Sequence, residues 1–172
     1  MTADPIATSP AVPSVVVERA TVRDAEAIHR VINFWAARGD LLPRTMGETY
    51  EHLRDFFVVR EQDEVVACVA LHITWADLAE VKSLAVREDR QTAGYGSALV
   101  RACIEEGRAL GLDQLFALTY RPGFFERLDF VQADVMHLPR KVWNECYRCP
   151  KFPGCNEIAM TLDLKSPAVA SA

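Results

Sequence analysis

The chain lacks several features that would assign it to a broad class of protein. It has no apolar run close to the roughly 20 residues that span a bilayer. Its first residues include no basic segment followed by a long apolar stretch, so we expect no secretory signal and a cytoplasmic location. It also lacks an excess of positive charge, because the formal net charge is −5 and the pI is near 5.4. These absences argue against a membrane partner and against general binding to nucleic acid.

What is present suits one folded domain. The chain has 172 residues, of which 50% are hydrophobic, enough for a sizeable core. Residues 1–14 hold three prolines without any hydrophobic period, and we expect a disordered leader there. Residues 165–172 have a similar composition and predict a disordered tail. Residues 15–164 are therefore expected to form the single domain.

The hydrophobic pattern predicts an α/β domain with a mixed (α+β) arrangement of helices and strands. Two capping boxes, at 21–24 and 45–48, each place side chains that satisfy orphan N–H groups at a helix start. A long helix is expected after a glycine-rich loop and up to about Leu110, and a short one at 124–128. Alternating or β-branched segments predict strands at 15–17, 56–60, 65–74, 80–86, 115–119, 130–135 and 158–164. The expected order is β-α-α-β-β-β-α-β-α-β with a late extra strand.

One loop, Gln91-Thr92-Ala93-Gly94-Tyr95-Gly96, lies between a predicted strand and the long helix. The first N–H groups of a helix have no partner within it, and the helix dipole favours negative charge there. Gly94 and Gly96 carry no Cβ, so the main chain can approach a phosphate closely. A dinucleotide-binding loop requires glycine or alanine where Leu99 stands, and the Gly-Lys-Ser/Thr of a P-loop is missing. A plain helix-start turn is the remaining alternative.

Two segments resemble the GNAT acetyltransferase superfamily. The first is Gln91-x-x-Gly94-x-Gly96 after the strand 81–86, and the second is the aromatic helix-to-strand segment 123–130. The resemblance implies a splayed mixed β-sheet flanked by helices, with acetyl-CoA as co-substrate. It implies that the amides of the loop hold the CoA pyrophosphate. The main chain that would pair with the pantetheine arm is that of Leu84, Ala85 and Val86.

A more particular resemblance is to short bacterial N-acetylglutamate synthases. It is carried by residues 41–44, by 79–86, and by 141–146 through 158–160. It implies a small-molecule acceptor, L-glutamate, acetylated on its α-amine as the first step of arginine biosynthesis. Two alternatives stay open, namely another small amine such as glutamine or a polyamine, and a non-catalytic acetyl-CoA sensor. A homodimer is compatible with each of these.

A glutamate acceptor carries two carboxylates and therefore needs fixed cations. We expect Arg44, which follows a Leu-Leu-Pro turn, and Lys82, on the strand beside the loop, to bind the substrate. The alternative for Arg44 is a solvated cation at a helix start. The alternative for Lys82 is a structural ion pair with Glu80, because residues two apart on a strand share a face.

The chemistry needs a base, because an α-amine arrives largely as ammonium and must lose a proton before it attacks the thioester. We assign this role to Glu80, acting through water. His72 and Thr74 are secondary candidates, and a satisfied core histidine is the alternative for His72. Many members of the superfamily carry a tyrosine as general acid where Phe125 stands here. Tyr120 is a substitute to consider, and the acid is left unassigned.

The five cysteines fall into two groups. Cys68 and Cys103 lie in apolar patterns and are expected in the core. The other three, in Cys146-x-x-Cys149-x5-Cys155, suggest a structural zinc site, with His137 or an acidic neighbour as fourth ligand. A redox pair and simple packed thiols are the alternatives.

Overall fold

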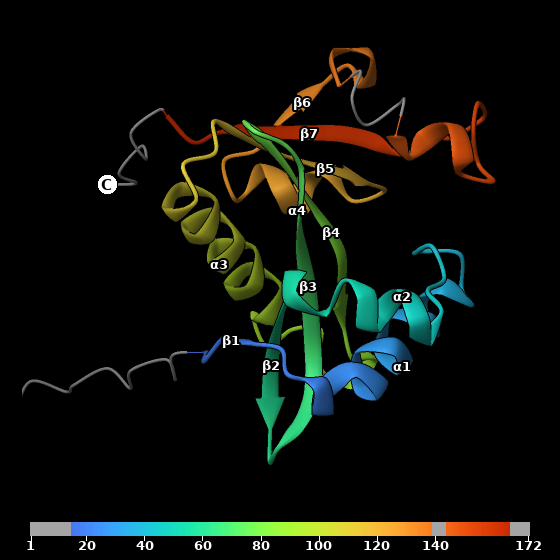
Figure 1. Ribbon diagram of the computed structural model, residues 1–172, viewed down its shortest axis with the longest axis vertical. Coiled ribbons are helices and arrows are strands. Elements are labelled where there is room, and N and C mark those ends of the chain that lie inside the picture. Colours follow the sequence, from blue (N-terminus) through green and yellow to red (C-terminus); the bar gives the residue numbers. More distant parts are fainter. Residues whose placement is uncertain (1–14, 139–143, 166–172) are drawn as a thin grey trace, which may run out of the picture.

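The computed structural model describes residues 15–138 and 144–165, and within these residues seven strands form one mixed sheet (Figure 1). The strands lie in the order β1-β2-β3-β4-β5-β7-β6, and β4 and β5 form the parallel pair. The strands are β1 (Glu18–Arg19), β2 (Phe56–Glu61), β3 (Glu64–Trp75), β4 (Leu78–Val86), β5 (Gln114–Thr119), β6 (Val131–Ala133) and β7 (Ile158–Asp163). The helices are α1 (Ala25–Ala36), α2 (Met46–Glu51), α3 (Tyr95–Ala109) and α4 (Pro122–Glu126). The predicted leader at 1–14 and all but the first residue of the predicted tail lie outside the described residues.

The predicted order of elements is confirmed, as are both capping boxes. The main-chain N–H of Thr21 donates to Asp24 Oδ2 at 2.6 Å, and that of Thr45 donates to Glu48 Oε2 at 2.7 Å. The first strand begins at Glu18, just after the residues 15–17 predicted to open it, because in the described part of the chain the ladder with β2 is confined to β1. A strand forms only where its main chain finds a partner, and apolar composition alone does not supply one.

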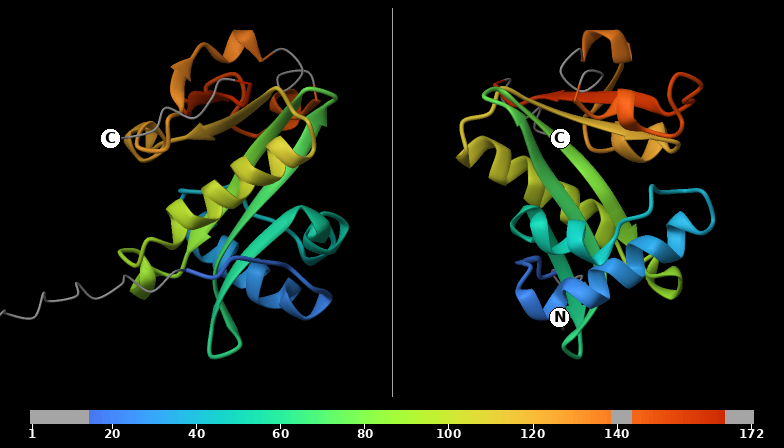
Figure 2. Two further views of the ribbon diagram at one scale, coloured as in Figure 1. Left: turned by 90° about the vertical axis from the view of Figure 1, so that its left-hand side faces the viewer. Right: turned by 45° about the vertical axis from the view of Figure 1, so that its right-hand side comes forward.

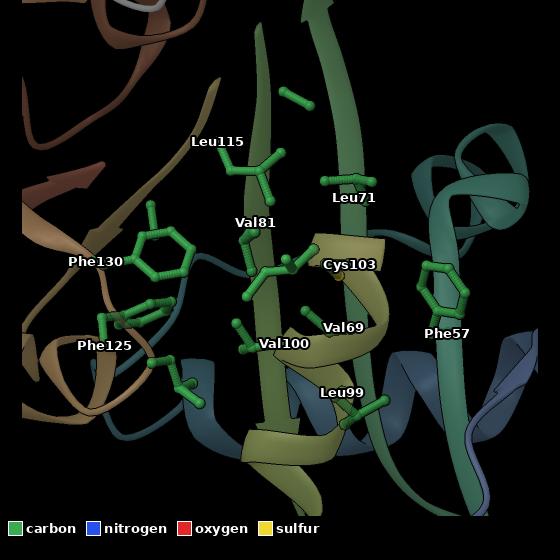
Figure 3. Packing of buried hydrophobic residues seen from close by; sticks show 14 of the residues in the cluster. Phe57, Val69, Leu71, Val81, Leu99, Val100, Cys103, Leu115, Phe125 and Phe130 are labelled. Atoms are coloured by element: carbon green, nitrogen blue, oxygen red, sulfur yellow. The ribbon is translucent and has the colours of Figure 1, made fainter. Parts of the chain in front are cut away.

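Helices α1 and α3 cover opposite faces of β2, β3 and β4 (Figure 2). Because successive strand residues point to opposite faces, each strand contributes to two clusters. The α3 cluster includes Phe57, Val69, Leu71, Val81, Leu99, Val100 and Cys103 (Figure 3). The α1 cluster includes Ile28, Val31, Ile32, Phe56, Val58 and Cys68. Burial raises the pKa of both core thiols, Cys68 and Cys103, to about 12, which confirms their predicted place in the core.

The parallel contact between β4 and β5 is short. It runs from Leu78↔Gln114 to Glu80↔Phe116, and beyond Glu80 the two strands separate. The register of β4 against β3 also shifts in this region, where Ser83 has a φ of 53°. The sheet is therefore splayed, and the second half of β4 has one edge that β5 does not cover. Among the described residues no helix has the length and apolar character needed to cross a membrane.

Candidate functional site

A cavity of about 680 Å³ lies beside the separated parts of β4 and β5. Its walls are residues 81–86 of β4, part of the glycine loop, residues 118–121 at and after the end of β5, and the start of α4. Seven of the residues predicted to bind the co-substrate line it: Leu84, Ala85, Val86, Gln91, Thr92, Gly94 and Gly96. The cavity thus joins the N-terminus of a helix to the open edge of a strand.

Each of the two glycines of the loop is required for a different structural reason. Gly94 is the N-cap of α3 and has a φ of +79°, a left-handed conformation that L side chains rarely adopt. A Cβ on Gly96 would lie 3.3 Å from the ring of Phe124, so this glycine permits α4 to approach α3. The first amides of α3 have no partner within the helix, which makes its N-terminus a seat for an anion.

Charged side chains around the loop are paired with one another. The hydroxyl of Tyr95 donates to Glu61, and this hydrogen bond raises the pKa of Tyr95. Arg90 Nε lies 2.9 Å from a carboxylate oxygen of the same Glu61. Arg87 Nε lies 2.7 Å from Asp89 Oδ1. Main-chain amides are therefore the donors that the loop offers to an anion, and Tyr95, predicted as part of the co-substrate loop, turns its side chain toward β2.

Arg44 reaches the cavity wall through Ser83. Its Nε donates to Ser83 Oγ at 2.9 Å, and Ser83 lines the cavity. The main chain of Arg44 is clamped by Asn33, whose amide accepts from its N–H at 3.1 Å and donates to its carbonyl at 2.8 Å. Its two terminal nitrogens have no hydrogen-bond partner within 15–138 and 144–165, so they are available to a carboxylate.

Lys82 lines the same end of the cavity and is held between two carboxylates. Its Nζ lies 3.2 Å from Glu80 Oε2 and 2.7 Å from Glu145 Oε2. Glu80 is buried, with 4% of its surface exposed. The ion pair that the strand spacing predicted between Lys82 and Glu80 is thus present, and a second carboxylate from the cysteine-bearing segment joins it. Lys82 belongs to β4, and Arg44 contacts the next residue of that strand, Ser83, from the segment before α2.

The secondary base candidates lie on β3. His72 is the register partner of Glu80, and its Nδ1 lies 2.8 Å from Asp55 Oδ2. Its Nε2 faces Glu145 Oε1 at 3.8 Å. Thr74 Oγ1 lies 3.5 Å from the carbonyl of His72. Among the described residues, Thr74 is not one of those that line the cavity.

The position of the usual tyrosine is filled by a buried ring. Phe125 is 5% exposed and packs edge-on against Phe130. Phe125 and Tyr120 both line the cavity, and the hydroxyl of Tyr120 accepts a hydrogen bond from Lys151 Nζ at 2.6 Å. That hydrogen bond raises the pKa of Lys151. The cavity therefore contains a phenol hydroxyl backed by a cation.

The structure does not support the zinc site expected at Cys146, Cys149 and Cys155. None of the three thiols forms a disulfide, and their sulfur atoms do not converge into a ligand group in the described part of the chain. Cys155 is exposed and its Sγ turns toward Glu157 Oε2 at 3.5 Å. Cys155 follows the Pro153-Gly154 turn, outside the 3-10 turn that holds Cys146 and is capped by Cys149. His137, proposed as a fourth ligand, is exposed on a separate turn.

Sequence reasoning missed several residues of the site. Trp35 Nε1 donates to the carbonyl of Val86 at 2.9 Å, which fixes the end of β4 at the cavity wall. Glu145 and Lys151 also reach the site, from a segment whose cysteines are its most conspicuous feature in the sequence. The one available signal was the excess of charged and aromatic residues around those cysteines.

Comparison with known proteins identifies the class. The acetyltransferase (GNAT) family model matches residues 24–130. An uncharacterized N-acetyltransferase of Chlorobaculum tepidum is 36% identical over 148 residues, covering 86% of this chain and 96% of that protein. The amino-acid acetyltransferase of Mycobacterium tuberculosis is 32% identical over 136 residues, covering 77% of this chain and 78% of that one.

A solved structure gives the same result. The N-acetylglutamate synthase of Neisseria gonorrhoeae, complexed with coenzyme A and N-acetyl-glutamate, superimposes with a TM-score of 0.77 at 25% identity. The match covers 89% of this chain and 36% of that longer one. The chain belongs to the GNAT acetyltransferase family. It is an acetyl-CoA-dependent N-acetyltransferase.

Proposed function

We propose that this enzyme transfers the acetyl group of acetyl-CoA to the α-amine of L-glutamate, giving N-acetylglutamate, in the cytoplasm. The observation that carries the proposal is the position of two cations at the cavity wall on β4: Lys82 lines the cavity, and Arg44 donates to the next residue, Ser83. Two fixed cations suit an acceptor with two carboxylates. The product would enter arginine biosynthesis.

Acetyl-CoA would bind along the rest of the cavity. The amides at the start of α3, with Gln91 to Gly96, would hold the pyrophosphate. The main chain of Leu84, Ala85 and Val86 would pair with the pantetheine arm on the edge that β5 leaves uncovered. In this proposed arrangement the thioester would lie near the point where β4 and β5 separate, beside Lys82.

The acceptor would displace one of the carboxylates from Lys82. Arg44 offers its two terminal nitrogens as a fork, and Lys82 exchanges Glu145 for a substrate carboxylate. Glu80 then remains beside the bound amino acid as the base that removes the ammonium proton through water, since its own carboxylate is buried. The free amine attacks the thioester carbonyl, and CoA departs as a thiolate.

Tyr120 is the proposed proton donor to that thiolate. Its hydroxyl lies in the cavity wall and is hydrogen-bonded to the Lys151 ammonium, which would stabilise the phenolate left after proton transfer. This assignment accommodates Phe125 at the position where many relatives carry the tyrosine.

The test is to follow release of the CoA thiol against a panel of amino acids and amines. Glutamate should give the highest kcat/KM. Preference for glutamine or a polyamine would show that glutamate is not the acceptor, while the enzyme would still be an acetyltransferase. Tight binding of acetyl-CoA without turnover of any acceptor would instead support the sensor alternative.

A further inference from the structure

We propose that His52, Asp55 and His72 form a binding site for a divalent transition-metal ion next to the acceptor pocket. The three side chains are the group in residues 15–138 and 144–165 whose potential ligand atoms all lie within 4.8 Å of one another. They belong to separate elements. His52 is the C-cap of α2, Asp55 ends the 3-10 turn Leu53–Asp55, and His72 lies on β3.

The spacing of the ligand atoms is close to what one ion needs. Asp55 Oδ2 lies 2.8 Å from His72 Nδ1 and 3.7 Å from His52 Nδ1. Bond lengths of about 2.0–2.1 Å in tetrahedral geometry place ligand atoms roughly 3.3 Å apart. The two imidazole rings are nearly perpendicular, at 87°, with centroids 5.2 Å apart. For all three atoms to surround one ion, the 2.8 Å contact must lengthen and the wider separations, which are at most 4.8 Å, must shorten.

The donor set selects the class of ion. Two imidazoles and one carboxylate suit zinc, nickel or cobalt, and do not suit magnesium or calcium, which prefer oxygen ligands. The side chains of His52, Asp55 and His72 are 36%, 26% and 28% exposed, so an ion and a water as fourth ligand can enter from solvent. The site therefore has the three-ligand form with one open position.

A carboxylate behind His72 completes the arrangement. Glu145 Oε1 lies 3.8 Å from His72 Nε2, on the side of the ring away from Asp55. When Nδ1 gives its lone pair to a metal, the ring proton resides on Nε2 and faces this carboxylate, the usual outer partner of a metal-bound histidine. The other oxygen of Glu145 contacts Lys82 Nζ at 2.7 Å. The metal site is thus one side chain removed from the acceptor pocket.

The site can be tested on full-length, tag-free protein stripped with chelator and titrated with Zn²⁺ by calorimetry, and with Co²⁺ by absorption. We expect about one ion per chain. His52→Gln and His72→Gln should each weaken binding roughly tenfold or more, and Glu145→Gln by about tenfold. His137→Gln is the matched control, because His137 is an exposed histidine outside the cluster and its substitution should leave the affinity unchanged.

Three results would overturn the proposal. The first is the absence of stoichiometric binding. The second is unchanged affinity in both His52→Gln and His72→Gln, with their melting temperatures without metal confirming that each is folded. The third is a thiolate-to-cobalt charge-transfer band that disappears in Cys146→Ser, which would place the ion at the cysteines. The readout is binding itself, so it does not depend on which amine the enzyme acetylates.

Discussion

At the scale of single residues, Arg44 has the most direct test. Replacing it with glutamine removes the fork offered to a substrate carboxylate, and keeps a polar group near Ser83. We expect the KM for glutamate to rise roughly ten- to a hundredfold, the loss expected for a charged hydrogen bond, while the KM for acetyl-CoA changes little. Steady-state kinetics with each substrate varied in turn measures both constants.

The matched control for Arg44→Gln is Arg101→Gln, which removes an exposed arginine on α3. It should leave both KM values unchanged. Equal effects of the two substitutions, or a loss of acetyl-CoA affinity in Arg44→Gln, would show that Arg44 does not bind the acceptor.

Tyr120 tests the proposed proton donor. Tyr120→Phe removes the hydroxyl that accepts from Lys151 and keeps the ring. We expect kcat to fall roughly ten- to a hundredfold, at the low end for general acid catalysis, because a thiolate is a good leaving group. Tyr50→Phe, at an exposed tyrosine of α2, serves as the control. An unchanged kcat in Tyr120→Phe would show that the thiolate leaves without this acid.

At the scale of elements, the junction between the loop and α3 can be separated from general helix stability. Gly94 and Gly111 both have left-handed φ values, +79° and +75°, and at each of them a Cβ would have no other atom within 4 Å. Alanine at either position should therefore destabilise the fold similarly, by about 1–2 kcal/mol in denaturant unfolding. Only Gly94 lines the cavity among these two.

CoA affinity should distinguish the two glycine substitutions. In Gly94→Ala the Cβ would point into the space proposed for the pyrophosphate, so we expect Kd for CoA to rise roughly tenfold. Gly111→Ala should bind CoA normally. If both variants bind CoA equally well, the loop does not hold the pyrophosphate.

The contribution that the start of α1 makes to the stability of the fold should depend on pH. Burial on its own would raise the pKa of Asp24, but hydrogen bonds from Arg60 and Thr21 outweigh it and lower the pKa overall. A carboxyl with a lowered folded pKa stabilises the protein above its unfolded pKa of about 4, and this contribution is lost as the pH falls through the folded value.

Asp24→Asn should therefore be less stable than the parent at pH 7, by about 1–3 kcal/mol. The difference should shrink as the pH falls below about 4. Urea unfolding at a series of pH values measures it, with the exposed Glu51→Gln as control. A difference that stays constant down to the acid limit would mean that Asp24 acts through packing and not through its charge.

The helices, their caps and the glycine loop were largely predictable from the sequence, because their signals are local. The capping boxes at 21–24 and 45–48 and the glycine loop each depend on residues within a few positions of one another. The first strand shows the limit, since the apolar residues 15–17 fit a strand but the ladder with β2 starts only at Glu18 and depends on where β2 lies.

The site itself was less predictable, because its contacts join distant parts of the chain. Arg44 meets Ser83 across 39 positions, and Lys82 meets Glu145 across 63. No local pattern encodes such a pair. The resemblance to known synthases indicated Arg44 and Lys82 as candidates, whereas Glu145 and the Lys151–Tyr120 contact emerged only from the packing of the C-terminal segment against β4 and β5.

At the scale of the whole molecule, the sheet has two parts joined by a short parallel ladder of three residue pairs. One part holds β1 to β4 and the other holds β5, β7 and β6. The cavity has walls from both parts, since residues 81–86 belong to the first and residues 118–121 to the second. A co-substrate bound there would bridge the parts and stabilise the folded state.

Saturating CoA should therefore raise the melting temperature. At a concentration of 100 times Kd, linkage predicts about 2.7 kcal/mol of added stability, or roughly 5–10 °C for a chain of this length. Amide hydrogen exchange should slow in residues 81–86 and at the start of α3, and should be unchanged in β1, which is remote from the cavity walls. At the same CoA concentration a tenfold weaker Gly94→Ala variant should lose about half of the shift, whereas Gly111→Ala should keep it. Protection confined to β5 and α4, with none on β4, would mean that CoA occupies one wall only, and the proposed pairing of pantetheine with β4 would then be wrong.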